Sequence, residues 1–162
     1  MKNDKLQSQT FLTAYEYNKL LYQKKRHGNC LSFAFGQTSH KYKTYDLLTF
    51  PQIVKLKHHR QMEKVDICDA FIKKAKEFGY EVKQISSLDE ASGQVSFIVF
   101  GWYTSYIEGI GDYEYFFHII RRNKNSSFEH KLDWDTPANT LTSYELNQWL
   151  ESDIKRYYFV VS

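Results

Sequence analysis

The sequence has no apolar run long enough to cross a membrane. Its longest such run, Val95–Tyr103, has the length of a strand, whereas a membrane-spanning helix needs about 18 consecutive apolar residues. The first ten residues are polar and lack the apolar core of a signal peptide. We therefore expect no membrane partner, and a protein that is cytoplasmic or is exported without a cleaved signal peptide.

Cysteine and excess charge are also scarce. Cys30 and Cys68 are the only cysteines, and without other marks of secretion they are expected to be free thiols. The net charge is +3, with basic runs only at Lys24–His27 and Lys55–Arg60, which favours solvated loops or helix ends over a nucleic-acid site. No close-spaced Cys pair and no His-x-x-x-His pair occurs, so the usual zinc spacings are absent. We expect no metal, no cofactor and no nucleic-acid partner.

The residues that are present predict one globular domain spanning 1–162. Hydrophobic residues make up 42% of the chain and charged residues 25%, which is typical of a folded domain. Helical periodicity dominates about 10–79 and strand-like alternation about 80–162, an order that predicts an α+β fold with N-terminal helices packed on a mostly antiparallel sheet. The expected helices are Thr10–Lys25, a short helix from Cys30 to near Gly36, Arg60–Phe78, and one begun by a Thr142–Glu145 capping box. The expected strands are Tyr80–Ile85, Val95–Tyr103, Glu114–Arg122, Phe128–Leu132 and Tyr157–Val161.

Two histidines fall on a predicted hairpin in the second half of the chain. The polar run Arg121–Ser127 is read as its turn. If the hairpin is symmetric about Lys124, residues whose numbers sum to 248 face each other, so His118 lies opposite His130. Two adjacent imidazoles among apolar neighbours are poorly suited to a hydrophobic core, so the pair is interpreted as part of a functional site.

A third candidate, Cys30, lies far upstream, after a helix that Gly28 is expected to close. Asn29 is a suitable N-cap, which places Cys30 in a first helical turn where unpaired N–H groups favour a thiolate. We expect the pKa of Cys30 to fall below the free value of about 8.5. The set predicts a thiol hydrolase in which Cys30 is the nucleophile, His118 the base and His130 the orienting residue. The Cys30 backbone N–H would serve as the oxyanion donor.

Other readings of the same residues stay open. Cys30 could be a buried free thiol among apolar neighbours, and His118 a core histidine. Asp133, Asp135 or Asn139 could orient His118 in place of His130. Cys68 lies on an apolar helical stripe with Met62, Val65, Ile72 and Ala75 and is expected to be a small core residue. The long segment Gln37–His59 is expected to form a flap over the site.

These residues also resemble a family. A Cys that opens a helix after Asn, a strand His and a second His twelve residues later resemble the NlpC-type papain-like hydrolases and their CHAP relatives. More narrowly, His118, Arg121, the run Phe128–Lys131 and Trp134 resemble a group of uncharacterised bacterial proteins assigned as cysteine peptidases. The resemblance implies a papain-like fold and a peptide or amide substrate, with peptidoglycan peptides as one candidate. The alternative is the same fold without turnover, acting as a protein- or ligand-binding module.

Overall fold

The computed structural model describes residues 11–38, 46–48, 66–103 and 115–162. Its centre is a six-stranded sheet in which each pair of neighbouring strands is antiparallel, with the order β1-β6-β2-β3-β4-β5. The predicted α+β class with a mostly antiparallel sheet is therefore confirmed. The strands are β1 (Val82–Ile85), β2 (Ser96–Tyr103), β3 (Tyr115–Arg122), β4 (Phe128–His130), β5 (Asn139–Thr140) and β6 (Lys155–Val161).

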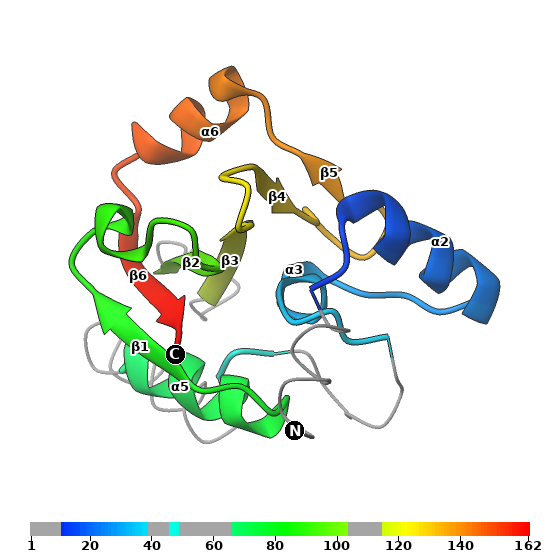
Figure 1. Cartoon of the computed structure of the whole chain (residues 1–162), viewed down its shortest axis with the longest axis horizontal. Helices are drawn as coiled ribbons and strands as arrows, with labels where there is room; N and C mark the ends of the chain where they lie inside the picture. Colours follow the sequence, from blue (N-terminus) through cyan, green and yellow to red (C-terminus); the bar gives the residue numbers. More distant parts are fainter. Residues whose placement is uncertain (1–10, 39–45, 49–65, 104–114) are drawn as a thin grey trace, which may run out of the picture.

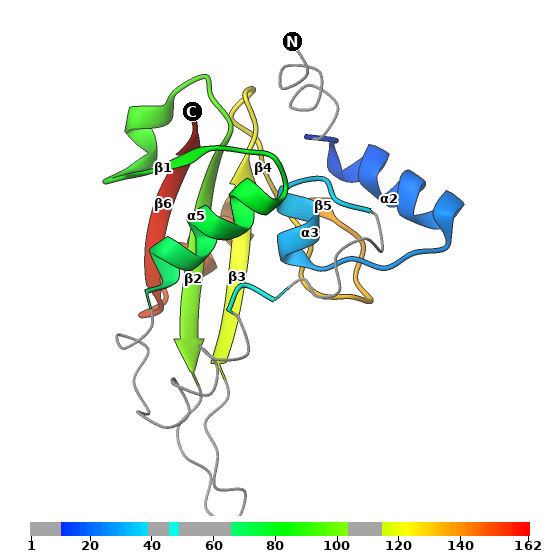
Figure 2. The same cartoon turned by 90° about the horizontal axis from the view of Figure 1, so that it is seen from below.

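Helices lie on both faces of this sheet (Figures 1 and 2). On one face, α3 and α5 pack against alternate residues of the central strands, among them Val99 and Ile119. On the other face, α6 packs against the intervening residues, such as Phe100 and Ile120. Strand β2 lies between two partner strands, β3 and β6. Because helices cover both faces of the sheet, the side chains of β2 are buried and apolar on both sides. The helices are α2 (Ala14–Lys24), α3 (Cys30–Ala34), α5 (Ile67–Glu77), the short 3-10 helix η2 (Leu88–Ala91) and α6 (Ser143–Leu150).

The first helix begins and ends differently from the prediction. Thr13 and Glu16 form a capping box, so α2 starts at Ala14. Lys25, not Gly28, adopts the left-handed conformation that closes it, with φ of 51°. Gly28 instead allows a close approach, since a Cβ there would lie 2.5 Å from the Tyr17 hydroxyl oxygen. The predicted cap at Gly28 is wrong, and the glycine serves the entry to α3.

The buried face of helix α5 differs in part from the predicted stripe, with which it shares Ala75. Its buried residues include Ala70 and Phe71, whereas Cys68 is only partly buried at the margin of the core. Cys68 therefore packs against the core, as predicted, but it is not fully buried in it. The predicted stripe residues Met62 and Val65 lie outside the described residues, as does most of the segment expected to form a flap.

The hairpin between β3 and β4 is shifted by two residues from the predicted register. Arg121 pairs with Glu129 and Arg122 with Phe128, so facing residues sum to 250 and not 248. Both arginines belong to the strand, and the turn occupies 123–127, where Ser126 has φ of 71°. Further on, the short strand β5 was not among the predicted strands.

Candidate functional site

The two histidines of the hairpin meet as predicted, although not as directly opposed residues. His118 Nε2 lies 2.7 Å from His130 Nδ1, and the rings are nearly perpendicular at 78°. With the observed register the two are diagonal neighbours. A shift of two residues keeps both side chains on one face of the sheet, and diagonal neighbours are within reach of large side chains. The prediction of adjacent imidazoles is confirmed, and the predicted register is wrong.

Aromatic residues fix the orientation of the His118 ring. Trp149 of α6 stacks on it with ring centroids 4.4 Å apart and an angle of 17°. Phe100 of β2 is its direct partner across the strand pair. Burial, and secondarily the charge of His130, lower the pKa of His118 to about 3. Burial also lowers the pKa of His130, against a smaller opposing effect of Glu145. Both rings are therefore held in their neutral forms at neutral pH.

Cys30 occupies the first turn of α3, as the Asn29 cap predicts. The Asn29 side chain accepts from the Ser32 N–H at 3.0 Å, and the Ser32 hydroxyl accepts from the Asn29 N–H at 2.7 Å. The Tyr17 hydroxyl donates to Ser32 at 3.1 Å, which ties this turn to α2. Cys30 is buried, with 4% of its surface exposed. Its position is confirmed, but it lies deeper than a reactive thiol usually does.

Helix α3, which carries Cys30, lies against β3. The backbone N–H groups of Ile119, Leu31 and Cys30 act on the thiol in the direction of a lower pKa. The thiol therefore lies near the backbone of the residue that follows His118.

The pKa of Cys30 moves in the direction opposite to the one predicted. Burial raises it to about 12, and the three N–H groups and the charge of Lys131 only partly offset that effect. Helix α3 has five residues, so few aligned peptide dipoles support a thiolate. In this structure the thiol is protonated at neutral pH. In the described part of the chain, hydrogen bonds join His118 to His130 but do not join Cys30 to either ring.

Lys131 is a member of the site that the sequence analysis did not assign. It directly follows His130 and is 3% exposed. Its Nζ donates to the carbonyl oxygens of Asp133 at 2.6 Å and Trp134 at 3.1 Å. Burial lowers the pKa of Lys131, against smaller opposing effects of Asp133, Asp135 and Cys30. The sequence signal was weak, because Glu129, Lys131 and Asp133 alternate along this segment as exposed charged residues of a strand would.

The alternative orienting residues are engaged elsewhere. One carboxylate oxygen of Asp133 accepts the N–H groups of Asp135 at 2.9 Å and Thr136 at 2.7 Å, and Asp133 is exposed. The Asn139 amide donates to the Thr140 carbonyl at 3.1 Å. In the described ranges, His130 is the residue whose side chain hydrogen-bonds to His118.

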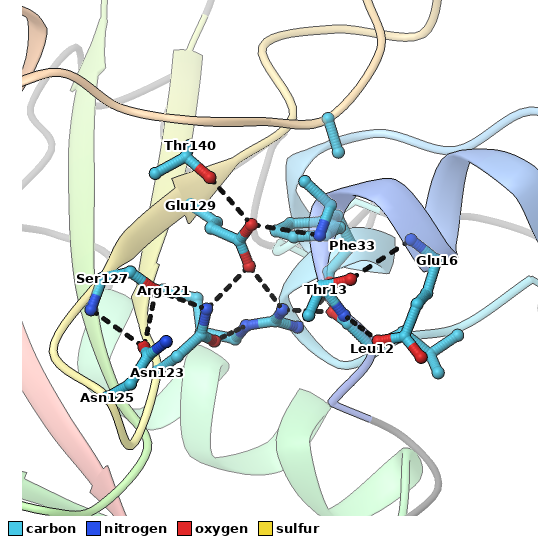
Figure 3. Close-up of polar contacts among 12 residues, drawn as sticks. Leu12, Thr13, Glu16, Phe33, Arg121, Asn123, Asn125, Ser127, Glu129 and Thr140 are labelled. Atoms are coloured by element: carbon cyan, nitrogen blue, oxygen red, sulfur yellow. Dashed lines mark hydrogen bonds and ion pairs between the residues drawn. The ribbon is translucent and has the colours of Figure 1, made fainter.

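A buried polar network beside the site was also missed, because Arg121 was read as part of a turn (Figure 3). Arg121 has no exposed surface and donates to the carbonyls of Phe33 at 3.1 Å and of Leu12. It also donates to the Asn123 side chain at 2.9 Å and lies 3.5 Å from a carboxylate oxygen of Glu129. Its guanidinium stacks over the Phe33 ring at 4.3 Å. Arg121 therefore fastens α3, the helix that carries Cys30, to β3.

Glu129 extends this network to two further elements, α2 and β5. It accepts from the Ala14 N–H at the start of α2 and from the Thr140 hydroxyl of β5, each at 3.1 Å. It also accepts from the Asn123 amide at 2.6 Å. The network thus fixes α2, α3 and β5 around the hairpin that carries both histidines.

Comparison of the chain with protein-family models, with curated proteins and with solved structures finds no match. Within the described residues, no three His, Cys, Asp or Glu side chains gather as a metal site would require. Among those same residues, none of the helices has both the length and the apolar character of a membrane span. We therefore infer the function from the residues of this chain.

Proposed function

We propose that this protein is a thiol hydrolase with a papain-like arrangement of Cys30, His118 and His130 that cleaves a peptide or amide bond. One observation carries the proposal. The Cys30 thiol lies close enough to β3 for the Ile119 N–H to oppose the rise in its pKa, and the preceding residue, His118, is hydrogen-bonded through Nε2 to His130. A thiol, an imidazole and a group that orients the imidazole are the parts of a cysteine hydrolase.

The histidine pair assigns a role to each ring nitrogen. If His118 is protonated on Nε2 and donates to His130 Nδ1, its Nδ1 is left as the base. His130 must then carry its proton on Nε2. Stacking on Trp149 keeps the His118 ring in one orientation, so the tautomer and the ring position are set together. This is the role predicted for His130.

The reaction follows as acyl transfer. His118 Nδ1 takes the thiol proton, and the Cys30 sulfur forms a bond to the substrate carbonyl carbon. The Cys30 N–H stabilises the oxyanion, and His118 returns the proton to the leaving amine as the carbon–nitrogen bond breaks. Water then attacks the thioester, with His118 again as base, and releases the acid. Peptidoglycan peptides are one substrate class that fits this chemistry.

The resting structure sets a condition on this mechanism. A thiol with a pKa near 12 and an imidazole with a pKa near 3 do not exchange a proton spontaneously. The thiolate and the imidazolium would have to stabilise each other as a pair, together with the N–H groups around the sulfur. Substrate binding would have to expose the buried Cys30 thiol and allow this ion pair to form.

The deep burial of Cys30 also favours a second candidate, a papain-like fold that binds a protein or ligand without turnover. Thiol reactivity separates the two functions. In the hydrolase, Cys30 of the folded protein reacts with an active-site-directed electrophile that carries a peptide. In the binding module, Cys30 stays unlabelled until the protein unfolds.

The direct test is turnover of peptide libraries and muropeptides by the wild type and two cysteine variants. Cys30→Ala should lower turnover by about 10⁴-fold or more, since loss of a catalytic nucleophile has effects of this size. Cys68→Ala is the matched control and should leave turnover unchanged. His118→Ala should cost nearly as much as Cys30→Ala, because members of one catalytic unit are not additive. Equal turnover by Cys30→Ala and wild type would rule the hydrolase out.

A further inference from the structure

Strand β5 has two residues and is the outermost strand of the described sheet. It pairs with β4 at two positions, which join Asn139 to His130 and Thr140 to Glu129. Strands in folded proteins usually have about five or six residues, so a strand this short is held only weakly by its own pairing. The backbone beside His130 therefore depends on contacts from outside the sheet.

Helix α2 lies beside β5 and supplies these contacts (Figure 1). At its start, the Ala14 N–H donates to the Glu129 carboxylate oxygen that also accepts from the Thr140 hydroxyl. One turn later, the Asn18 amide bonds to both backbone groups of Ala138, the residue before β5. Its nitrogen donates to the Ala138 carbonyl and its oxygen accepts the Ala138 N–H, each at 2.8 Å. Positions i and i+4 share one face of a helix, so one face of α2 is bound to the β4–β5 pair at two points.

The Asn18 amide fixes the backbone at the start of β5. Ala138 is 5% exposed, so its N–H and C=O have little access to water and would lose their partners without Asn18. A primary amide carries an acceptor and donors side by side, and it therefore binds both groups of one residue as a neighbouring strand would. Asn18 thus takes the place of the strand that β5 lacks on this side.

We propose that Asn18 is a positioning residue for His130 and acts on it through β5. This inference rests on the proposed hydrolase function, in which His130 orients His118. Asn18 holds Ala138, and the next residue, Asn139, pairs with His130 across the two strands. His130 Nδ1 in turn lies 2.7 Å from His118 Nε2. A hydrogen bond is lost beyond about 3.5 Å, so a displacement of the His130 ring by about 1 Å breaks the contact between the imidazoles.

The first test follows the N–H proton shared by the two imidazoles by NMR at pH 7. Both rings are buried, so this proton is protected from exchange with water and gives a resonance of its own. Asn18→Leu keeps a side chain of similar size but removes both bonds to Ala138, and it should lose the resonance. Thr13→Ala is the matched control, because it removes the N-cap of α2 and destabilises the same helix while both bonds to Ala138 remain. This control should keep the resonance.

A second variant covers the case in which Asn18→Leu does not fold. The carboxylate of Asn18→Asp still accepts the Ala138 N–H but cannot donate to the Ala138 carbonyl, so the resonance should be weakened. A folded Asn18→Leu or Asn18→Asp variant with the wild-type resonance overturns the proposal. Loss of the resonance in Thr13→Ala also overturns it, because the resonance would then report the stability of α2 as a whole.

A double-mutant cycle on turnover separates positioning of His130 from a general effect on stability. Asn18→Leu alone should lower kcat by about fivefold with KM unchanged, the loss expected when His118 is left without one hydrogen bond. In a His130→Ala background, Asn18→Leu should lower kcat no further, and a further loss of similar size overturns the proposal. The NMR resonance does not depend on turnover. Failure of the hydrolase function, seen as equal turnover by wild type and Cys30→Ala, is therefore a separate result.

Discussion

Arg121 and Lys131 are both buried cations close to the β3–β4 hairpin, and their surroundings differ. Arg121 has a carboxylate at 3.5 Å, two backbone carbonyls, an amide oxygen and an aromatic ring. Lys131 has two backbone carbonyls and, in the described residues, no bound carboxylate. The guanidinium of Arg121 thus has both hydrogen-bond acceptors and an anionic partner, whereas the ammonium of Lys131 has acceptors alone among the described residues.

The pKa values of the buried groups also differ between the Arg121 network and the candidate site. Burial lowers the pKa of Arg121 to about 10, with Glu129 opposing the shift, so Arg121 stays charged at neutral pH. Burial also raises the pKa of Cys30 to about 12 and lowers that of His118 to about 3. Strongly perturbed pKa values are frequent at functional sites. We therefore interpret the Arg121 network as the support, and Cys30 with the His118–His130 pair as the candidate site that it holds.

The largest expected effect comes from breaking the support. Arg121→Met leaves the Glu129 carboxylate buried without its cation, and removing one member of a buried ion pair costs about 3–5 kcal/mol of unfolding free energy. Urea denaturation at pH 7 measures this loss. The control is Lys83→Met on β1, where an exposed lysine should change stability by less than about 0.5 kcal/mol. A loss from Arg121→Met as small as that of the control would show that the network is not the support.

Much of the fold could be predicted because its elements are amphipathic. A continuous apolar run located β2, alternating residues located β3, and the Thr142–Glu145 capping box located the start of α6. The hairpin register could not be predicted, since a shift of two residues leaves every side chain on the same face and the hydrophobic pattern unchanged. Arg121 fell where the predicted strand Glu114–Arg122 and the predicted turn Arg121–Ser127 overlap, and its polar neighbours favoured the turn. Its partners, Phe33 and Glu129, come from other elements and override that preference.

The site was predictable to the extent that it depends on local pattern. Parity along the hairpin was enough to bring His118 and His130 together, and the Asn29 cap was enough to place Cys30 in a first turn. The apolar neighbours of Cys30 left a buried thiol open as an alternative, but the sequence could not decide its depth, because that depends on how α3 packs against β3, far away in the sequence. The same holds for its pKa, since burial is the largest cause of the shift.

A smaller effect is expected from acidifying the site. The pKa of His118 is about 3 in the folded protein and about 6.5 when unfolded. The unfolded state thus binds the extra proton first, and stability that is present above pH 6.5 is lost as the pH falls toward 3. The loss amounts to about 2 kcal/mol at pH 5. Urea denaturation at pH 7 and pH 5 measures it.

Two histidine variants test whether His118 causes this loss of unfolding free energy between pH 7 and pH 5. His118→Asn should remove most of the difference between pH 7 and pH 5. His27→Asn, which changes an exposed histidine of the loop before α3, should leave the difference unchanged. A His118→Asn variant that loses as much stability at pH 5 as wild type would place the acid-sensitive group elsewhere, and the contrast with the Arg121 network would fail.

The smallest expected effect concerns His130, which belongs to the site but only orients another residue. Asparagine can present an oxygen that accepts from His118 Nε2, so His130→Asn should keep turnover close to wild type. His130→Ala removes that acceptor and should cost about 1 kcal/mol, the worth of one hydrogen bond, or about a fivefold loss of turnover. Asp133→Ala is the control, because its carboxylate bonds the turn at Thr136 and not His118. If Asp133→Ala abolished turnover while His130→Ala left it intact, the contact of 2.7 Å between the imidazoles would be structural. The orienting role would then belong to Asp133.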